Sequence, residues 1–293
     1  MIEILNGYEA LGTRFWIEVY DEDINVDAIA STLISCIDEF ENKYSRFDDA
    51  SFLNMHTLED LLKDEEAGDI LEKSFVFMRE SDGVFDIFIK DKLEEKGYGI
   101  KRDVNKNNID LGGIGKGYLI DKLASILKVK FNLKYFLING GGDMYMTSDN
   151  EIPIDIYMQH PVNDDEYIYK ISLKDQAFTA SSSFKRRWIK SNSKPDHDKF
   201  DNDISDSDNT VNHFISPDST EVWSASYVIA DDAMTADVYA TVLCIEPDPT
   251  LIKNKVYANT IEYFVIKEGE IYKSSGFDSF IKNDSFTKDK YNI

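Results

Sequence analysis

Residues 110–121 read DLGGIGKGYLID, and this stretch marks where the chain turns into a helix expected over about residues 116–130. It holds four glycines: Gly112, Gly113, Gly115 and Gly117. Glycine lets a ligand approach the main chain without meeting a Cβ, and a helix N-terminus offers unpaired N–H groups to an anion. Lys116 adds a cation at the same place. The stretch predicts a phosphate-binding turn, or alternatively a tight strand-to-helix turn without a ligand.

The glycine pattern matches neither of the two common nucleotide-binding motifs. A P-loop needs Gly at the position that Asp110 occupies and Ser or Thr after the lysine, where this chain has Gly117. The dinucleotide pattern fails because Tyr118 stands where its last glycine is required. The motif alone therefore leaves the kind of ligand open.

The rest of the chain alternates between helical and strand patterns. Apolar residues at three- and four-residue steps predict helices over about 25–44 and 69–80, and shorter alternating stretches predict strands. These strands are expected at 11–21, 134–139, within 153–190, and as a closing hairpin over 263–274. The pattern predicts the α+β class, with packed helices and antiparallel-looking strands in a single domain spanning 1–293.

Composition sets the broad class of the protein. The 293 residues are 42% hydrophobic and 13% aromatic, as in a folded globular protein. No apolar run is long enough for a transmembrane segment, and the N-terminus lacks the basic and apolar pattern of a signal peptide. We therefore expect a cytoplasmic protein, or an exported one if the chain is a trimmed piece. Cys36 and Cys244 are expected to be buried free thiols.

The net charge argues against nucleic acid as a partner. Fifty-five acidic against 32 basic side chains give a net charge of −23, whereas nucleic-acid binding depends on cationic neutralisation of phosphates. A phosphate-bearing ligand would need a metal ion or a local cation. Many aspartates lie in an expected solvated insertion at about 191–211; a calcium loop is the alternative interpretation, although the glycine of an EF-hand is missing.

Two further patterns could carry chemistry. Asp237 and Thr241 lie four residues apart, hence on one face of a helix, and present the hard oxygens that Mg²⁺ prefers. A plain Asp–Thr hydrogen bond is the alternative. His213 precedes a Pro-containing turn, where it could move a proton, contact phosphate or fill a pocket.

Two loops could contact a ligand directly. The run Asn139-Gly140-Gly141-Gly142-Asp143 could bring an amide and bare backbone close to a flat ring, or form an ordinary hairpin turn. Ser181 begins a serine run followed by basic residues, which could hold a phosphate or form an exposed strand.

In sequence order, these stretches resemble the motifs of the ApbE family, the FAD:protein FMN transferases. The matching segments are EALGTRFWIEV, YSRFDDASFLN, DGVFDIFI, DLGGIGKGYLID, FLINGGGD, TASSSFKRRW, NHFISPDS and MTADVYATVL. The resemblance runs from about residue 9 to 245. It implies a T-fold-like architecture of mixed sheets and packed helices.

The resemblance also implies a reaction and roles for residues. Such enzymes are Mg²⁺-dependent, bind FAD as a substrate, and move FMN to a Ser or Thr hydroxyl of an acceptor protein with release of AMP. Asp237, Thr241 and the Gly115 carbonyl match the metal ligands, and His213 and Lys116 the catalytic groups. The expected FAD-binding residues are Gly112, Gly113, Gly115, Lys116, Asn139, Gly140, Gly141, Asp143 and Ser181.

Three departures from the family pattern keep alternatives open. Asn212 and Ser216 stand where the family has His and Asp, and Ser219-Thr220 replaces a Thr-Gly pair. A Mg²⁺-dependent FAD pyrophosphatase, with water in place of the protein hydroxyl, is the first alternative. A non-catalytic flavin-binding protein is the second, and the loss of the Asp before Pro217 favours it. Retention of His213 and the Asp237–Thr241 pair favours an enzyme.

Overall fold

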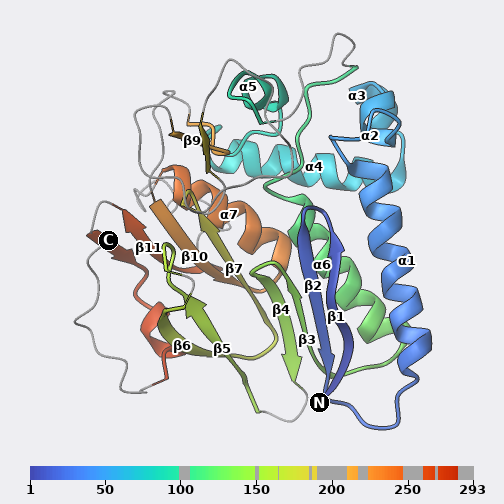
Figure 1. Ribbon diagram of the computed structural model, residues 1–293, viewed down its shortest axis with the longest axis vertical. Coiled ribbons are helices and arrows are strands. Elements are labelled where there is room, and N and C mark those ends of the chain that lie inside the picture. The colour runs from blue at the N-terminus through green and yellow to red at the C-terminus, as the bar shows by residue number, and fades with distance from the viewer. Residues whose placement is uncertain are drawn as a thin grey trace.

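The centre of the protein is an antiparallel sheet in the order β1-β2-β3-β4-β7-β10-β11-β12 (Figure 1). The computed structural model describes residues 1–98, 106–148, 152–163, 165–184, 187–189, 210–216, 224–246, 260–267 and 270–282. The sheet strands are β1 (Ile2–Ala10), β2 (Thr13–Val19), β3 (Tyr135–Gly140), β4 (Asp143–Ser148), β7 (Gln176–Ser182), β10 (Ser224–Ala230), β11 (Glu262–Lys267) and β12 (Glu270–Lys273). Two short pairs lie outside it: β5 (Ile154–Gln159) with β6 (Tyr167–Leu173), and β8 (Arg187–Ile189) with β9 (Thr210–Asn212).

Helices occupy the stretches between these strands. They are α1 (Val26–Tyr44), α2 (Phe52–Met55), α3 (Leu58–Leu61), α4 (Glu65–Glu80), α5 (Lys90–Glu95), α6 (Gly115–Ser125), the π-helical turn η1 (Ile126–Lys130), α7 (Ala233–Ile245) and the 3₁₀ helix η3 (Phe277–Phe280). The α+β class expected from the sequence is confirmed.

Three layers bury the apolar residues. Helices α6 and α7 pack on one face of the sheet, with α1 beside β1 and β2, and the β5–β6 hairpin lies on the other face (Figure 1). Strand β10 is buried along its whole length: Val228 belongs to the core on the helix side, while Tyr227 and Ile229 belong to the core under the hairpin. Because successive strand residues point to opposite faces, a strand between two layers is apolar on both.

Helix boundaries follow capping side chains. Asn25 accepts a hydrogen bond from the Ala28 N–H at 3.1 Å and starts α1 where predicted. Asp64 does the same for Ala67 at 2.8 Å, so α4 begins before the predicted start at about residue 69. The helix predicted over 116–130 is α-helical to Ser125 and ends in the π-helical turn.

Two local expectations differ from the structure. Strand β1 is not predicted by the sequence pattern, and its pairing with β2 shifts register between Glu3 and Leu5 and between Asn6 and Tyr8. Such bulges break the alternation on which strand prediction depends. The described residues before the glycine turn, 106–111, form no strand, so the turn joins an irregular segment to α6. The acidic stretch expected as an insertion lies almost wholly outside the described residues.

Candidate active site

A cavity of about 680 Å³ opens where the sheet, the glycine turn and the end of α1 meet. Its walls come from distant parts of the chain: the β1–β2 turn, the end of α1, residues 84–98, the glycine turn, Gly141 and Gly142, the end of β7, residues 213–215, and α7. The predicted residues that line it are Gly112, Gly113, Gly115, Lys116, Gly141, Ser181, His213, Asp237 and Thr241. Its size is that of a small-molecule site.

Asp110 fixes the start of the glycine turn. Its Oδ1 accepts a hydrogen bond from the Gly112 N–H at 2.8 Å, and its Oδ2 lies 2.8 Å from Nη1 of Arg46. Both side chains of this ion pair are buried, 8% and 7% exposed. A charge removed from water this far needs its partner, so Arg46 and Asp110 hold the turn against the end of α1.

Gly117 lets α6 and α7 touch. A Cβ at this position would lie 2.4 Å from the carbonyl oxygen of Ala233, so only glycine fits. The Gly117 N–H donates to Oδ2 of Asp237 at 3.0 Å. Gly117 of the sequence motif thus serves helix packing, a role that glycine spacing alone does not reveal.

The Asp237–Thr241 pair faces the glycine turn from α7. Asp237 is only 2% exposed, and its Oδ1 lies 3.8 Å from Nζ of Lys116. A Cβ at Gly113 would lie 3.3 Å from Oγ1 of Thr241, so a bare backbone faces this hydroxyl. Lys116 also pairs with Asp143. The carboxylate, the hydroxyl and the lysine therefore converge on one wall of the cavity.

The Asn139–Asp143 segment is a hairpin turn between β3 and β4. Gly141 and Gly142 have φ of +74° and +100°, and both line the cavity. Asn139 and Gly140 do not line it: the Asn139 side-chain oxygen accepts a hydrogen bond from the Gly142 N–H at 2.9 Å. Asp143 does not line the cavity either, but it forms an ion pair with Lys116, which does.

His213 lines the cavity just after β9. Its ring centroid is 4.2 Å from that of Phe214 and 6.4 Å from that of Tyr98. Lys96 Nζ donates to the Phe214 carbonyl at 2.9 Å, and the side-chain oxygen of Asn212 accepts the Phe214 N–H at 3.0 Å. These two hydrogen bonds hold in place the backbone next to His213. Ser216 is half-buried, while Pro217, Ser219 and Thr220 lie outside the described residues.

The serine run divides between the cavity and the core. Ser181 and Ser182 line the cavity, but Ser183 is fully buried, accepts the Ser224 N–H at 2.8 Å and donates to the Ser224 carbonyl at 3.0 Å. Ser183 therefore joins β7 to β10. The basic residues Lys185 and Arg186 lie outside the described part.

Arg46 is a cavity residue that the sequence patterns do not assign to the site. Its guanidinium carbon lies 4.7 Å from the ring centroid of Phe47 and 4.8 Å from that of Tyr98, and it donates to the Tyr98 carbonyl. Cation–π contacts of this kind hold the two rings beside Asp110. The arginine followed by an aromatic residue, just after a long helix, was the available signal.

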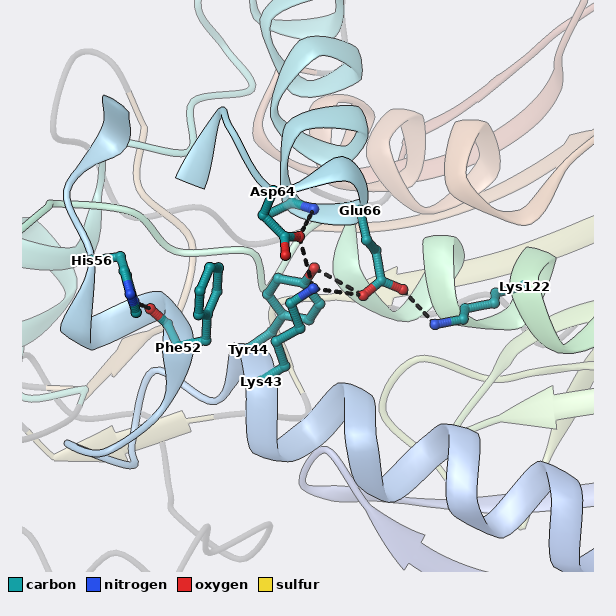
Figure 2. Close-up of polar contacts among 8 residues, drawn as sticks. Lys43, Tyr44, Phe52, His56, Asp64, Glu66 and Lys122 are labelled. Atoms are coloured by element: carbon teal, nitrogen blue, oxygen red, sulfur yellow. Dashed lines mark hydrogen bonds and ion pairs between the residues drawn. The ribbon is translucent and has the colours of Figure 1, made fainter. Parts of the chain in front are cut away.

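An ion-pair cluster links the end of α1 to α4 and α6 (Figure 2). Lys43 Nζ lies 2.7 Å from Oδ1 of Asp64 and 3.3 Å from Oε2 of Glu66, which also accepts from the Tyr44 hydroxyl at 3.0 Å. Lys122 of α6 pairs with the other oxygen of Glu66. Burial opposes ionisation of Glu66, but the bonds from Lys122, Tyr44 and Lys43 outweigh it and lower the pKa of this carboxyl.

Two other histidines and both cysteines lie outside the cavity lining. His56 contacts the carbonyl of Phe52 through Nδ1 at 2.9 Å (Figure 2), and His160 Nδ1 accepts the Asn163 N–H at 3.0 Å in its loop. Both cysteines are free and buried, and burial raises the pKa of the Cys244 thiol to about 12. His197 lies outside the described residues.

The described side chains restrict how a metal ion could be held. Among the described residues, no group of three or more His, Cys, Asp or Glu side chains could hold a metal ion. A metal near α7 would therefore use hydroxyl, carbonyl or ligand oxygens beside Asp237. The described helices include none with the length and apolar character needed to cross a membrane.

Comparisons with known proteins agree with this architecture. An ApbE protein from Thermotoga maritima is 23% identical with a TM-score of 0.72, over 96% of this chain and 99% of that one. The flavin transferase ApbE from Vibrio cholerae is 17% identical with a TM-score of 0.71, over 93% and 97%. The flavinyl transferase ApbE from Pseudomonas stutzeri is 14% identical with a TM-score of 0.69, over 93% and 95%.

These solved structures establish a shared fold. A search of curated protein sequences gives no significant match. The sequence does match the family model described as the ApbE family over residues 89–259, more than half of its 293 residues. The matched residues include the glycine turn, the His213 segment and α7. This chain therefore belongs to the ApbE family.

Proposed function

We propose that this protein is a Mg²⁺-dependent flavin transferase that moves FMN from FAD to a Ser or Thr hydroxyl of an acceptor protein. One observation carries the proposal: the glycine turn, the Asp237–Thr241 pair and His213 line the same cavity of about 680 Å³. Membership in the ApbE family and the flavin-transferase names of the structurally similar proteins support it. Release of AMP balances the transfer.

The donor set near α7 fits a magnesium ion. Asp237 offers a carboxylate, Thr241 a hydroxyl and Gly115 a backbone carbonyl, all from residues that line the cavity. These are hard oxygen ligands, and Mg²⁺ keeps its remaining positions for water and phosphate oxygens. The absence of a Cβ at Gly113, beside Thr241, leaves room there. When bound, the ion would neutralise charge on the pyrophosphate during transfer.

The chain's own residues have distinct tasks in this proposal. Lys116, held beside Asp143 and Asp237, supplies a positive charge to the pyrophosphate in a protein whose net charge is −23. Gly141 and Gly142 let the flavin half approach the backbone. His213 accepts the proton of the attacking hydroxyl as the new phosphoester forms and the bond to AMP breaks.

Incubation of the purified protein with FAD and Mg²⁺ tests the proposal. We expect AMP to appear when serine- or threonine-containing acceptor peptides are added, with FMN bound covalently to the peptide. AMP release at the same rate without any acceptor would instead identify an FAD pyrophosphatase. FAD binding with no AMP under either condition would identify a flavin-binding protein that does not turn over.

A thermal-shift measurement tests the ligand separately from turnover. Because both halves of the dinucleotide would lie in the cavity, FAD should raise the melting temperature more than FMN or AMP alone. Equal shifts from AMP and FAD would contradict a flavin site.

A further inference from the structure

Asp121 joins α6 to the start of α7. Its Oδ1 accepts a hydrogen bond from the Ala233 N–H at 2.8 Å, and its Oδ2 accepts one from the Met234 N–H at 2.9 Å. These are the first two residues of α7, whose N–H groups have no partner within their own helix. The side chain of the N-cap residue Asp232 accepts a hydrogen bond from a different residue, the Thr235 N–H, at 2.7 Å.

The bonds to Asp121 form the second of two contacts between the same helices. Gly117 and Asp121 are four residues apart on α6, and Ala233 and Asp237 are four residues apart on α7. Residues at this spacing share a helix face. Gly117 bonds to the Asp237 carboxylate, while Asp121 bonds to the backbone one turn earlier. The two contacts fix both the distance and the register of α7 against α6.

We propose that Asp121 is a positioning residue for the magnesium site: it sets where α7 presents Asp237 and Thr241 to the glycine turn. This inference rests on the proposed function. Asp121 does not line the cavity, and its two carboxylate oxygens bond to the backbone of α7. It acts through the first turn of α7, as residues behind a metal ligand commonly do.

The structure also limits how α7 can respond when Asp121 is changed. Near its C-terminal end, Ser226 of β10 donates to the Ala240 carbonyl at 2.5 Å, and Ser224 donates to the Cys244 carbonyl. With that half held by the sheet, a change at Asp121 would tilt the first turn and move Asp237. A small movement matters because metal ligands must keep their geometry to a fraction of an ångström.

Magnesium titration of Asp121→Asn tests the role. The amide keeps the shape of the side chain but has a single oxygen for two N–H donors. We expect Mg²⁺ affinity in the presence of FAD, measured by calorimetry, to fall about 10- to 100-fold. AMP release should recover toward the wild-type rate at saturating Mg²⁺, because the variant needs a higher Mg²⁺ concentration but catalyses the same step. Asp231→Asn, an exposed acid two residues before α7, is the matched control and should titrate like the wild type.

Asp121→Glu separates positioning from helix capping. A glutamate still caps α7, so the melting temperature without metal should stay near that of the wild type, but the longer side chain displaces the first turn. Magnesium affinity should fall for this variant too, which also keeps the test decisive if Asp121→Asn fails to fold. Wild-type affinity in a folded Asp121→Glu or Asp121→Asn protein overturns the positioning role alone. A wild-type protein that binds no Mg²⁺ overturns the metal dependence of the proposed function, and the role of Asp121 with it.

Discussion

Gly117 and Asp237 meet across the contact between α6 and α7, where the Gly117 N–H donates to Oδ2 of Asp237 at 3.0 Å. One glycine thereby joins the helix that follows the glycine turn to the helix that carries the proposed metal ligands. The contact is possible because no Cβ separates the two backbones.

Substitution of Gly117 should destabilise the protein. In Gly117→Ala the new Cβ would lie 2.4 Å from the Ala233 carbonyl oxygen, and backbone cannot move aside as a flexible side chain can. We expect a loss of about 1–3 kcal/mol in the free energy of unfolding, measured by urea denaturation. Gly115→Ala is the matched control: its nearest neighbour would be the Leu111 Cβ at 3.6 Å, an ordinary contact. Equal losses in the two variants would contradict this account.

The Arg46–Asp110 ion pair gives a prediction about buried charge. Arg46→Met leaves the Asp110 carboxylate buried without its cation, and we expect a loss of about 3–5 kcal/mol in unfolding free energy. The double variant Arg46→Met/Asp110→Asn should recover part of that loss because the stranded charge is gone. If the double variant is less stable than Arg46→Met, desolvated charge is not the cause.

The cluster around Glu66 makes the free energy of unfolding depend on pH. The pKa of Glu66 and that of Asp64 are both lowered, since bonds from lysines outweigh burial. Their folded state binds protons less readily than the unfolded state, so this stability is present above the unfolded pKa and is lost as pH falls through the lowered values. Glu66→Gln should lower the urea midpoint at pH 7. The difference between the urea midpoints at pH 7 and at acidic pH should be smaller for this variant than for the wild type. Identical pH profiles for the variant and the wild type would refute the assignment.

Asp237 is expected to be essential for the metal-dependent step. Asp237→Asn keeps the side-chain shape but removes the charge that holds a hard cation, so Mg²⁺-dependent AMP release should disappear while the circular dichroism spectrum is retained. Thr241→Val should reduce AMP release in the same direction and by less. Full activity of Asp237→Asn would rule out its role as a ligand.

Substitution of His213 should affect FMN transfer and FAD binding to different extents. His213→Ala should lower FMN transfer by roughly 10²–10⁴-fold, the usual contribution of a general base, while FAD binding falls much less. Ser216→Asp, which restores the carboxylate of the family pattern, should raise the rate of transfer. An unchanged rate in both variants would make His213 structural and favour a flavin-binding protein without turnover.

The sequence by itself determined the class of the fold and most of its elements. Periodicity predicted α1 from its apolar face, and alternation predicted β5, because burial on one face leaves a local pattern. The glycine turn, the Asp237–Thr241 spacing and His213 were also visible in the chain, because each consists of few residues close together. Strand β1 was missed because its bulges break that local pattern.

Only the tertiary structure decided how these pieces work together. Gly117 against Ala233, Arg46 with Asp110 and Asp121 with the start of α7 join residues far apart in sequence, and nothing in their local sequence reveals these partners. In the structure the Asn139 side chain bonds within its own hairpin and Asp143 pairs with Lys116, and neither residue lines the cavity. Local pattern reports which face of an element is buried; packing between elements decides which side chains meet.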